Sequence, residues 1–374
     1  MGRIRRWIAW LLCASIFFVC TACTKTDDVS VEQLPDALTH PASVVSGPAD
    51  GKDEAAYTFG FLWGGESDYY EPMPAMFSRA CEELQIPIPV DATPAHWIQE
   101  EQNQKLDELL ADGIRGISMM PSEEYAGNEK IEELTRQGIP IVCIGGAPAQ
   151  PSTCTLTLAT DVYQCAYDAT LALLEHIGYE GNIVAITGAT TDTNSEKRLK
   201  GVADACLQYS HVTLVDKVAG ITSEESALSI VGDLLEEWGD QTDGVVAMDY
   251  YAAYAMAYYL LRNQDYSHIA CVGIDSDPLV LEAIREDKMI GSMSQNPWAP
   301  AYLSVYTLKM LVDGWSYRNG QPAIVDSGSF LITKDLVNDY ETKAIELTME
   351  LAETWADRFY PPASAATAVK ETAA

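Results

Sequence analysis

The sequence is short of positive charge: 23 lysines and arginines stand against 55 aspartates and glutamates, and the formal net charge is −32 over 374 residues. Proteins that bind nucleic acid need basic patches against the phosphates, so we exclude nucleic acid as a partner. The same deficit disfavours peripheral contact with anionic lipid. The simplest role of the acidic surface is to keep the protein soluble.

The common signatures of catalysis and metal binding are also missing. There is no GxGxxG, GxxxxGK[ST] or GxSxG stretch, and the five histidines form no HExxH. After residue 23 no two cysteines have the close spacing of zinc ligands. These six cysteines are Cys81, Cys143, Cys154, Cys165, Cys206 and Cys271. We expect buried free thiols, no metal and no cofactor. A disulfide is the alternative, and Cys154 and Cys165 are the pair nearest in sequence.

A long apolar run occurs at the N-terminus, where Ile8–Val19 follows three arginines. The segment Cys20-Thr21-Ala22-Cys23 closes it, which is typical of a signal peptide. Small residues ending in a cysteine resemble a bacterial lipobox, whose cysteine becomes the lipidated N-terminus. We therefore expect lipid attachment at Cys23, with a plain secretory signal as the alternative.

The rest of the chain alternates strand and helix patterns, which predicts parallel sheets. Two such series are joined by an extended segment at Thr153–Ala159, and this indicates two similar lobes with a cleft between them. We expect a signal peptide at 1–23, a flexible tether at 24–54, a first lobe at 55–156 plus 296–323, a second lobe at 157–295 plus 324–360, and a disordered tail at 361–374.

One stretch, His268–Pro297, organises the second series. It is predicted to form a strand that ends at Asp275, then a helix, then a second strand that ends at Gln295. Ligands of open parallel sheets bind just outside the carboxyl ends of the strands. The two polar side chains are therefore expected to lie in one binding cleft.

This stretch, VGIDSDPLVLEAI followed by GSMSQNP, resembles the periplasmic sugar-binding proteins of the ribose-binding type, the type I solute-binding fold. In that family a V-G-[FI]-D strand end and a [VM]-x-Q-x-P strand end face the ligand. The resemblance extends from Tyr57 to Val325. It implies an α/β fold of two Rossmann-like lobes with parallel sheets, joined by a three-strand hinge near Thr153–Ala159, Gln295–Pro297 and Pro322–Val325.

The resemblance also implies ligand contacts on the second lobe. Asp275 and Gln295 match the two strand ends. Arg198, with Gly201 and Val202, matches the family's R-x-x-G-[FV] segment, in which the arginine enters the cleft. Asp249 follows a strand, and both a ligand contact and a capping role for the next helix stay open.

On the first lobe, aromatic residues follow the first strand. Tyr69 and Tyr70 match paired aromatics of the family, and Trp63 ends the strand; two of the three are expected to contact the ligand. Two departures stand out: Gly145-Gly146 replaces a common aspartate, and Met248 stands where we align the family's asparagine. These departures suggest that the ligand is no ordinary pentose or hexose.

The resemblance thus implies an extracytoplasmic solute-binding protein, lipid-anchored to a bacterial cell membrane. It would capture a sugar or sugar-like molecule as a monomer and deliver it to an ABC permease, without catalysis. A receptor subunit for a membrane signalling kinase stays open. A sugar-responsive repressor is disfavoured because the N-terminus and charge do not suit DNA. An exported glycosidase would need a carboxylate pair such as Asp249 and Asp275.

Overall fold

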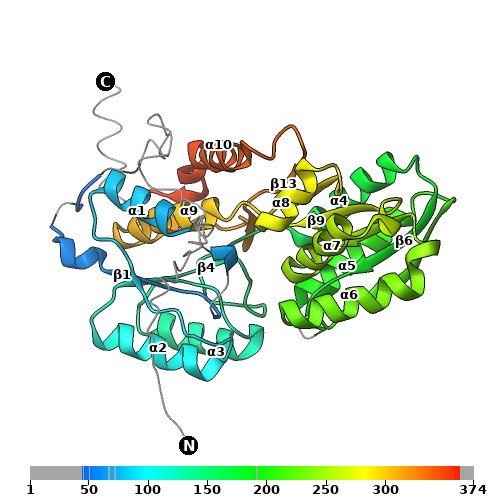
Figure 1. Ribbon diagram of the computed structural model, residues 1–374. Coiled ribbons are helices and arrows are strands. Elements are labelled where there is room, and N and C mark those ends of the chain that lie inside the picture. The colour runs from blue at the N-terminus through cyan, green and yellow to red at the C-terminus, as the bar shows by residue number, and fades with distance from the viewer. Residues whose placement is uncertain are drawn as a thin grey trace, which may run out of the picture.

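The computed structural model describes residues 44, 46–49, 51–65, 68–70, 73–190 and 193–362. The predicted signal peptide and Cys23 lie outside these residues, as do most of the tether and of the tail. The described chain forms two lobes, each a sheet with helices on both faces (Figure 1). This confirms the predicted α/β class with two lobes.

The sheet of the first lobe is wholly parallel, with the strand order β12-β5-β4-β3-β1-β2. Its central strands are buried along their whole length, as a parallel sheet covered on both faces requires. The strands are β1 (Phe59–Leu62), β2 (Val90–Asp91), β3 (Gly116–Met119), β4 (Ile141–Ile144), β5 (Thr157–Ala159) and β12 (Ile324–Asp326).

The sheet of the second lobe has the order β13-β10-β9-β8-β6-β7 and is parallel except at one edge, where β13 runs antiparallel to β10. The strands are β6 (Gly181–Ile186), β7 (Val212–Val218), β8 (Gly244–Ala247), β9 (Ala270–Ile274), β10 (Gly291–Ser294) and β13 (Phe330–Ile332). A small separate sheet pairs β11 (Ser316–Tyr317) with β14 (Phe359–Tyr360).

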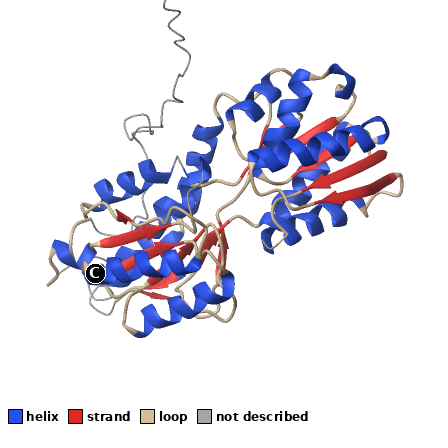
Figure 2. Cartoon of the chain, turned by 60° about the horizontal axis from the view of Figure 1, so that its bottom comes forward, coloured by secondary structure: helices blue, strands red, loops and turns tan. Residues whose placement is uncertain are grey.

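Helices cover both faces of each sheet, and Figure 2 shows this layering in both lobes. The first lobe has α1 (Met73–Leu84), α2 (Gln99–Ala111), α3 (Glu124–Arg136), α9 (Trp298–Val312) and α10 (Tyr340–Glu353). The second has α4 (Val162–His176), α5 (Thr193–Cys206), α6 (Glu224–Trp238), α7 (Tyr250–Arg262) and α8 (Pro278–Arg285). Short 3-10 turns are η2 (Glu54–Tyr57), η3 (Asp68–Tyr70), η4 (Gly239–Gln241), η5 (Gln264–Tyr266) and η6 (Trp355–Arg358).

Helix α9 is the centre of the first lobe. Every residue from Trp298 to Met310 is buried, because the helix lies between the sheet, α1 and α10. A helix that is apolar all round belongs in a core. Its one buried cation, Lys309, is paired with Asp313, whose other oxygen accepts a hydrogen bond from the Tyr57 hydroxyl. The burial of this charge is therefore compensated.

Three segments cross between the lobes close to the predicted places, and they are bonded to one another. Thr160 follows β5, Gln295 follows β10, and Ser327 follows β12. The Thr160 hydroxyl lies 2.5 Å from the Gln295 carbonyl oxygen and 3.2 Å from the Ser327 Oγ. Asn296 donates from Nδ2 to the Ser327 carbonyl at 2.7 Å. The crossings thus form one hydrogen-bonded bundle.

The division of the chain between the lobes differs from the one expected. The predicted second lobe included β5 and β12, but both strands pair within the first sheet. It also included the chain after residue 332, yet α10 and Phe359 pack into the core of the first lobe. The chain therefore crosses a fourth time after β13. An amphipathic helix fits either lobe, so its pattern alone does not choose between them.

Some element ends have local causes. Helix α2 begins at Gln99, because Ile98 is extended and Trp97 packs on a neighbouring loop. Helix α10 begins only at Tyr340, because the residues before it span the two lobes.

All six described cysteines are free. Cys154 lies beside Cys143, because the segment that leads into β5 runs along β4, whereas Cys165 lies in the core of the second lobe. A hydrogen bond with Cys143 lowers the pKa of the Cys154 thiol to about 7.

Candidate functional site

Three of the predicted residues form one hydrogen-bonded set on the second lobe. Gln295 accepts from Arg198 Nη2 at 3.0 Å and donates from Nε2 to Asp275 Oδ1 at 2.7 Å. All three side chains are at most 9% exposed. Arg198 comes from α5, while Asp275 and Gln295 follow the neighbouring strands β9 and β10. The structure therefore brings Asp275 and Gln295 together, as their positions at the ends of neighbouring strands predicted, and places Arg198 beside them.

Backbone conformation helps to position Asp275. Its φ is +65°, in the left-handed region that costs a non-glycine residue energy. Hydrogen bonds to β10 stabilise this conformation: the Asp275 N–H donates to the Met293 carbonyl at 2.8 Å, and Ser292 Oγ donates to the Asp275 carbonyl at 2.6 Å. Such strain persists where the surroundings over-determine it and is common at functional sites.

The Asp275 carboxyl has an unusual acidity. Burial raises its pKa from 3.8 to about 6, and the charge of Asp249 adds to this rise. The hydrogen bond from Gln295 and the charge of Arg198 act in the opposite direction. Desolvation therefore outweighs the favourable contacts. A carboxyl in this state gains from further hydrogen-bond donors, which hydroxyl groups can supply.

Two polar atoms of the site have no hydrogen-bond partner among the described residues. They are the buried Ser195 Oγ and Arg198 Nε, which lie on the same face of α5 three residues apart. Buried polar groups are normally paired. The sequence analysis did not single out Ser195, although its spacing from Arg198 was a usable signal.

Asp249 caps α7. Its Oδ1 accepts from the backbone N–H groups of Tyr251 and Ala252 at 3.0 and 3.2 Å. This is the capping role that the sequence analysis left open, and the charge of Asp249 still acts on Asp275. Met248 is 1% exposed in the core behind the sheet. Met248, which directly follows β8, packs there with Cys165 and Val202.

Tyr69, on the first lobe, is within electrostatic reach of this set. Burial raises the pKa of its hydroxyl well above the usual range, the charge of Asp275 raises it further, and Arg198 lowers it. These electrostatic interactions join predicted residues of the two lobes. Sequence reasoning predicted Tyr69 from its place after the first strand.

The other two predicted aromatics pack against each other. Trp63 and Tyr70 are stacked at 4.1 Å between ring centroids with an interplanar angle of 3°. Trp63 is 4% exposed and also contacts Phe61 and Phe77, so its ring belongs to the core. Tyr70 is nearly as buried, and its hydroxyl lies 3.1 Å from the Met120 sulfur. Tyr70 also packs edge-on against Tyr69, with 5.2 Å between the ring centroids.

The space beside Gly145-Gly146 is taken by Met120. A Cβ atom on Gly146 would stand 2.9 Å from the Met120 methyl carbon, and Gly145 has a positive φ of +72°. The thioether therefore occupies the region where a larger residue would project. Sequence reasoning noted the glycines but missed Met120, which follows strand β3 without a motif of its own.

Two buried glutamines hold the loops on this side of the site. Gln102 donates from Nε2 to the carbonyl oxygens of Trp63 and Met120 at 3.0 and 2.7 Å. Gln99 accepts from the Glu123 backbone N–H at 3.0 Å. Gln102 thus ties α2 to the ends of β1 and β3, and Gln99 ties it to the start of α3. The polar groups of both glutamines thus make hydrogen bonds that hold the first lobe together.

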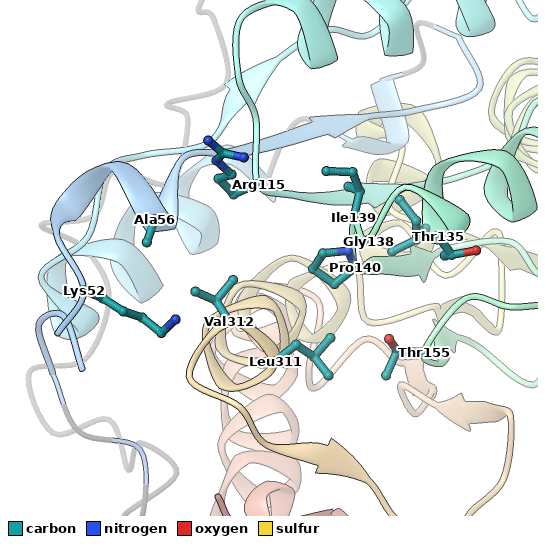
Figure 3. Close-up of a pocket in the computed structure, with 11 residues that line it drawn as sticks. Lys52, Ala56, Arg115, Thr135, Gly138, Ile139, Pro140, Thr155, Leu311 and Val312 are labelled. Carbon is teal, nitrogen blue, oxygen red and sulfur yellow. The ribbon is translucent and has the colours of Figure 1, made fainter. Parts of the chain in front are cut away.

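A pocket of about 530 Å³ lies elsewhere, at the amino-terminal edge of the first sheet (Figure 3). It is lined by Arg115 at the start of β3, by Pro140 before β4 and by Val312 at the end of α9. Because the predicted residues follow the opposite, carboxyl ends of the strands, this pocket is not the predicted site. Within the described ranges, no cluster of metal-ligating side chains occurs, and no helix has the length and apolar character to span a bilayer.

Comparison with known proteins agrees with this architecture. The model of the periplasmic binding protein domain matches residues 59–315, and the chain belongs to this family. Among curated proteins, the xylitol-binding protein of Mycolicibacterium smegmatis is 22% identical over 237 residues, 63% of this chain and 66% of that protein. The D-apiose import binding protein of Paraburkholderia graminis is 23% identical over 195 residues, 52% of this chain and 62% of that protein. The chain thus spans slightly less than two thirds of these relatives.

Solved structures show the same fold. A sugar-binding protein of a sugar ABC transporter from Bacillus halodurans has a TM-score of 0.69 at 20% identity, covering 76% of this chain and 99% of that one. An arabinose-binding protein from Geobacillus stearothermophilus has a TM-score of 0.67 at 21% identity, covering 75% and 98%. At these identities the likeness shows the two-lobed fold and no more.

Proposed function

We propose that this protein is an extracytoplasmic solute-binding protein that captures a sugar or sugar-like compound between its lobes for an ABC importer. The observation that carries the proposal is the buried set of Arg198, Gln295 and Asp275, in which Arg198 and Asp275 act electrostatically on Tyr69 of the other lobe. Family membership and the names of the relatives support it.

The chemistry of the set suits hydroxyl groups, which both donate and accept hydrogen bonds. Arg198 can only donate, ionised Asp275 can only accept, and Gln295 does both. Ser195 offers a further hydroxyl beside Arg198. The ring of Tyr69 offers an aromatic face to the apolar face of a sugar ring. No bond is made or broken, and the capping role of Asp249 argues against a catalytic carboxylate pair.

Capture would proceed by closure of the lobes around the ligand. The bonded bundle at Thr160, Gln295 and Ser327 is suited to act as the hinge, because it joins the crossing segments at one place. Gln295 belongs both to this bundle and to the ligand set. A ligand bonded to its side chain would therefore act directly on the hinge.

The proposal includes attachment to the membrane by lipid at Cys23 and action as a monomer. Mass spectrometry of protein extracted from membranes tests the first: a lipid-modified Cys23 peptide is expected, and Cys23→Ser should release the protein into the medium. Recovery of an unmodified N-terminal peptide from membranes would contradict it. Sedimentation of the domain tests the second.

The function itself is tested by a thermal-shift screen of residues 44–362 against pentoses, hexoses, alditols, disaccharides and nucleosides. A compound that binds only the folded state raises Tm. We expect a sugar or alditol to raise Tm, and Asp275→Asn to abolish the shift. A shift from nucleosides alone would keep the binding function and overturn the sugar. No shift with any class would overturn both.

A further inference from the structure

A pocket of about 440 Å³ lies at the amino-terminal edge of the second sheet. This volume is typical of small-molecule sites. Its lining includes the residues that lead into β9 and β10, whereas Asp275 and Gln295 follow the other ends of these strands. All of the lining residues lie inside the described ranges 73–190 and 193–362. The pocket is therefore separate from the interlobe site.

Four of the lining side chains are histidine or lysine. His176 ends α4 and His268 stands before β9, while Lys288 stands before β10 and Lys334 follows β13. Because β13 runs antiparallel to β10, the segment after β13 returns beside the one that leads into β10. The two lysines thus lie on neighbouring segments. The whole chain has 23 lysines and arginines against 55 acids, so such a lining stands out from the rest of the surface.

The charges of this lining do not cancel. Of the described residues that form it, one, Asp287, is acidic, and its carboxylate pairs with Lys334. The ring of His268 is held by two backbone carbonyl oxygens, each 3.0 Å from a ring nitrogen. The Lys288 ammonium makes no ion pair within the described ranges of the chain. One positive charge is therefore left over, and it is available to an anion.

Four apolar side chains form the floor of the pocket, and each is at most 4% exposed. They are Leu260, Ile269, Cys271 and Met289. Apolar ligand surface that covers this floor leaves water, which favours binding. A bare inorganic ion would leave the floor uncovered. The lining therefore suits a ligand that joins an anionic group to an apolar body.

We propose that this pocket binds a small organic phosphate, with the phosphate beside Lys288 and Lys334 and the apolar body on the floor. A phosphate monoester has up to two negative charges and three acceptor oxygens, so it meets several donors at once. His176 supplies a further N–H donor. The net charge of −32 repels anions in general, so their binding needs a local site of this kind. The interlobe site takes no part, so this proposal and sugar capture stand or fall separately.

The experiment uses phenyl phosphate as the probe, titrated into the purified protein by calorimetry at constant ionic strength. Inorganic phosphate and phenol serve as its two halves, and benzoate as an anion of another class. Phenyl phosphate should bind about tenfold more tightly than inorganic phosphate, the scale of partial burial of one ring. Phenol should not bind measurably, and benzoate should bind more weakly than phenyl phosphate.

Variants locate the phosphate. Lys288→Gln should weaken phenyl phosphate about tenfold, the scale of one charge-assisted hydrogen bond. Lys343→Gln is the matched control, because it makes the same change of charge on α10 of the first lobe, and should have no effect. Arg198→Ala should also have no effect.

A variant at Asp287 should act in the opposite direction. Asp287→Asn releases Lys334 and should tighten binding about threefold, the scale of one exposed ion pair. Asparagine accepts the positive φ of 56° at this position, so the backbone is kept. A gain in affinity cannot come from damage to the fold.

Four outcomes overturn the proposal. Phenyl phosphate does not bind, or it binds no better than benzoate. Lys288→Gln and Lys343→Gln weaken it equally, which shows a general effect of charge. Arg198→Ala abolishes binding, which places the anion in the interlobe site. Asp287→Asn weakens binding, which shows that Lys334 and its acid do not compete with the phosphate. None of these outcomes affects the proposed capture of a sugar.

Discussion

The two sides of the site are built differently. The second lobe contributes charged and amide side chains that bond one another, and all of them follow strand ends or lie on α5. The described part of the first lobe contributes aromatic rings and the Met120 thioether, while its glutamines are bonded to backbone. Under the proposed function, the second lobe would bind the hydroxyl groups of the ligand, and the first lobe would accommodate its apolar faces.

The largest effect is expected at Trp63, whose ring lies in the core of the first lobe. Trp63→Ala should lower the free energy of unfolding by about 3–5 kcal/mol, because it leaves a cavity beside Phe61 and Phe77. Urea denaturation measures this loss. A loss of affinity with unchanged stability would show instead that the ring faces the ligand.

On the polar side, binding should be most sensitive to the loss of Asp275. Asp275→Ala should weaken binding of the most stabilising sugar of the screen about a hundredfold, since charge-assisted hydrogen bonds contribute about 1.5–3 kcal/mol each. Calorimetry measures the change. Asp277→Ala is the matched control: it removes the cap of α8, which accepts from Leu279 at 2.7 Å, and should cost stability without affinity. Equal affinity losses in both variants would contradict the assignment.

The acidity of Asp275 gives a pH test. Hydroxyl groups favour the ionised carboxylate, so affinity should rise about tenfold between about pH 5 and about pH 7, across its pKa of about 6. The empty protein should show the opposite trend. Since the folded pKa lies above the usual 3.8, folding stability falls as pH rises from 3.8 to about 6. Both trends should vanish in Asp275→Asn; affinity that stays constant with pH in the parent protein would exclude a role for ionised Asp275.

The smallest effect is expected at the meeting point of the two sides. Tyr69→Phe keeps the ring but removes the hydroxyl, so affinity should fall about fivefold, the scale of one neutral hydrogen bond. Tyr70→Phe, whose hydroxyl contacts Met120 within the first lobe, should leave affinity nearly unchanged. If both variants bind like the parent protein, the aromatic side acts through its ring faces alone.

The polar side was predictable from sequence because strand ends carry a local signal: an acid or amide follows an apolar run, and parallel strands bring such ends together. Asp275 and Gln295 were found in this way. Met120 was not, because its place beside Gly145-Gly146 depends on packing between separate segments of the first lobe. The packing of Met248 and the lobe to which α10 belongs could not be predicted either. An apolar pattern shows that a face is buried but does not show which surface covers it.

The fourth crossing places both ends of the described chain on one lobe. Near the start, the Gly47 N–H donates to the Leu84 carbonyl of α1, and near the end Pro362 lies beside Gly314, just after α9. An attachment at either end of the described chain would therefore act on the first lobe and leave the second lobe unattached. For the same reason, fluorophores fused to the two termini would sit on one rigid body and report nothing of closure. A distance sensor needs one label on the second lobe.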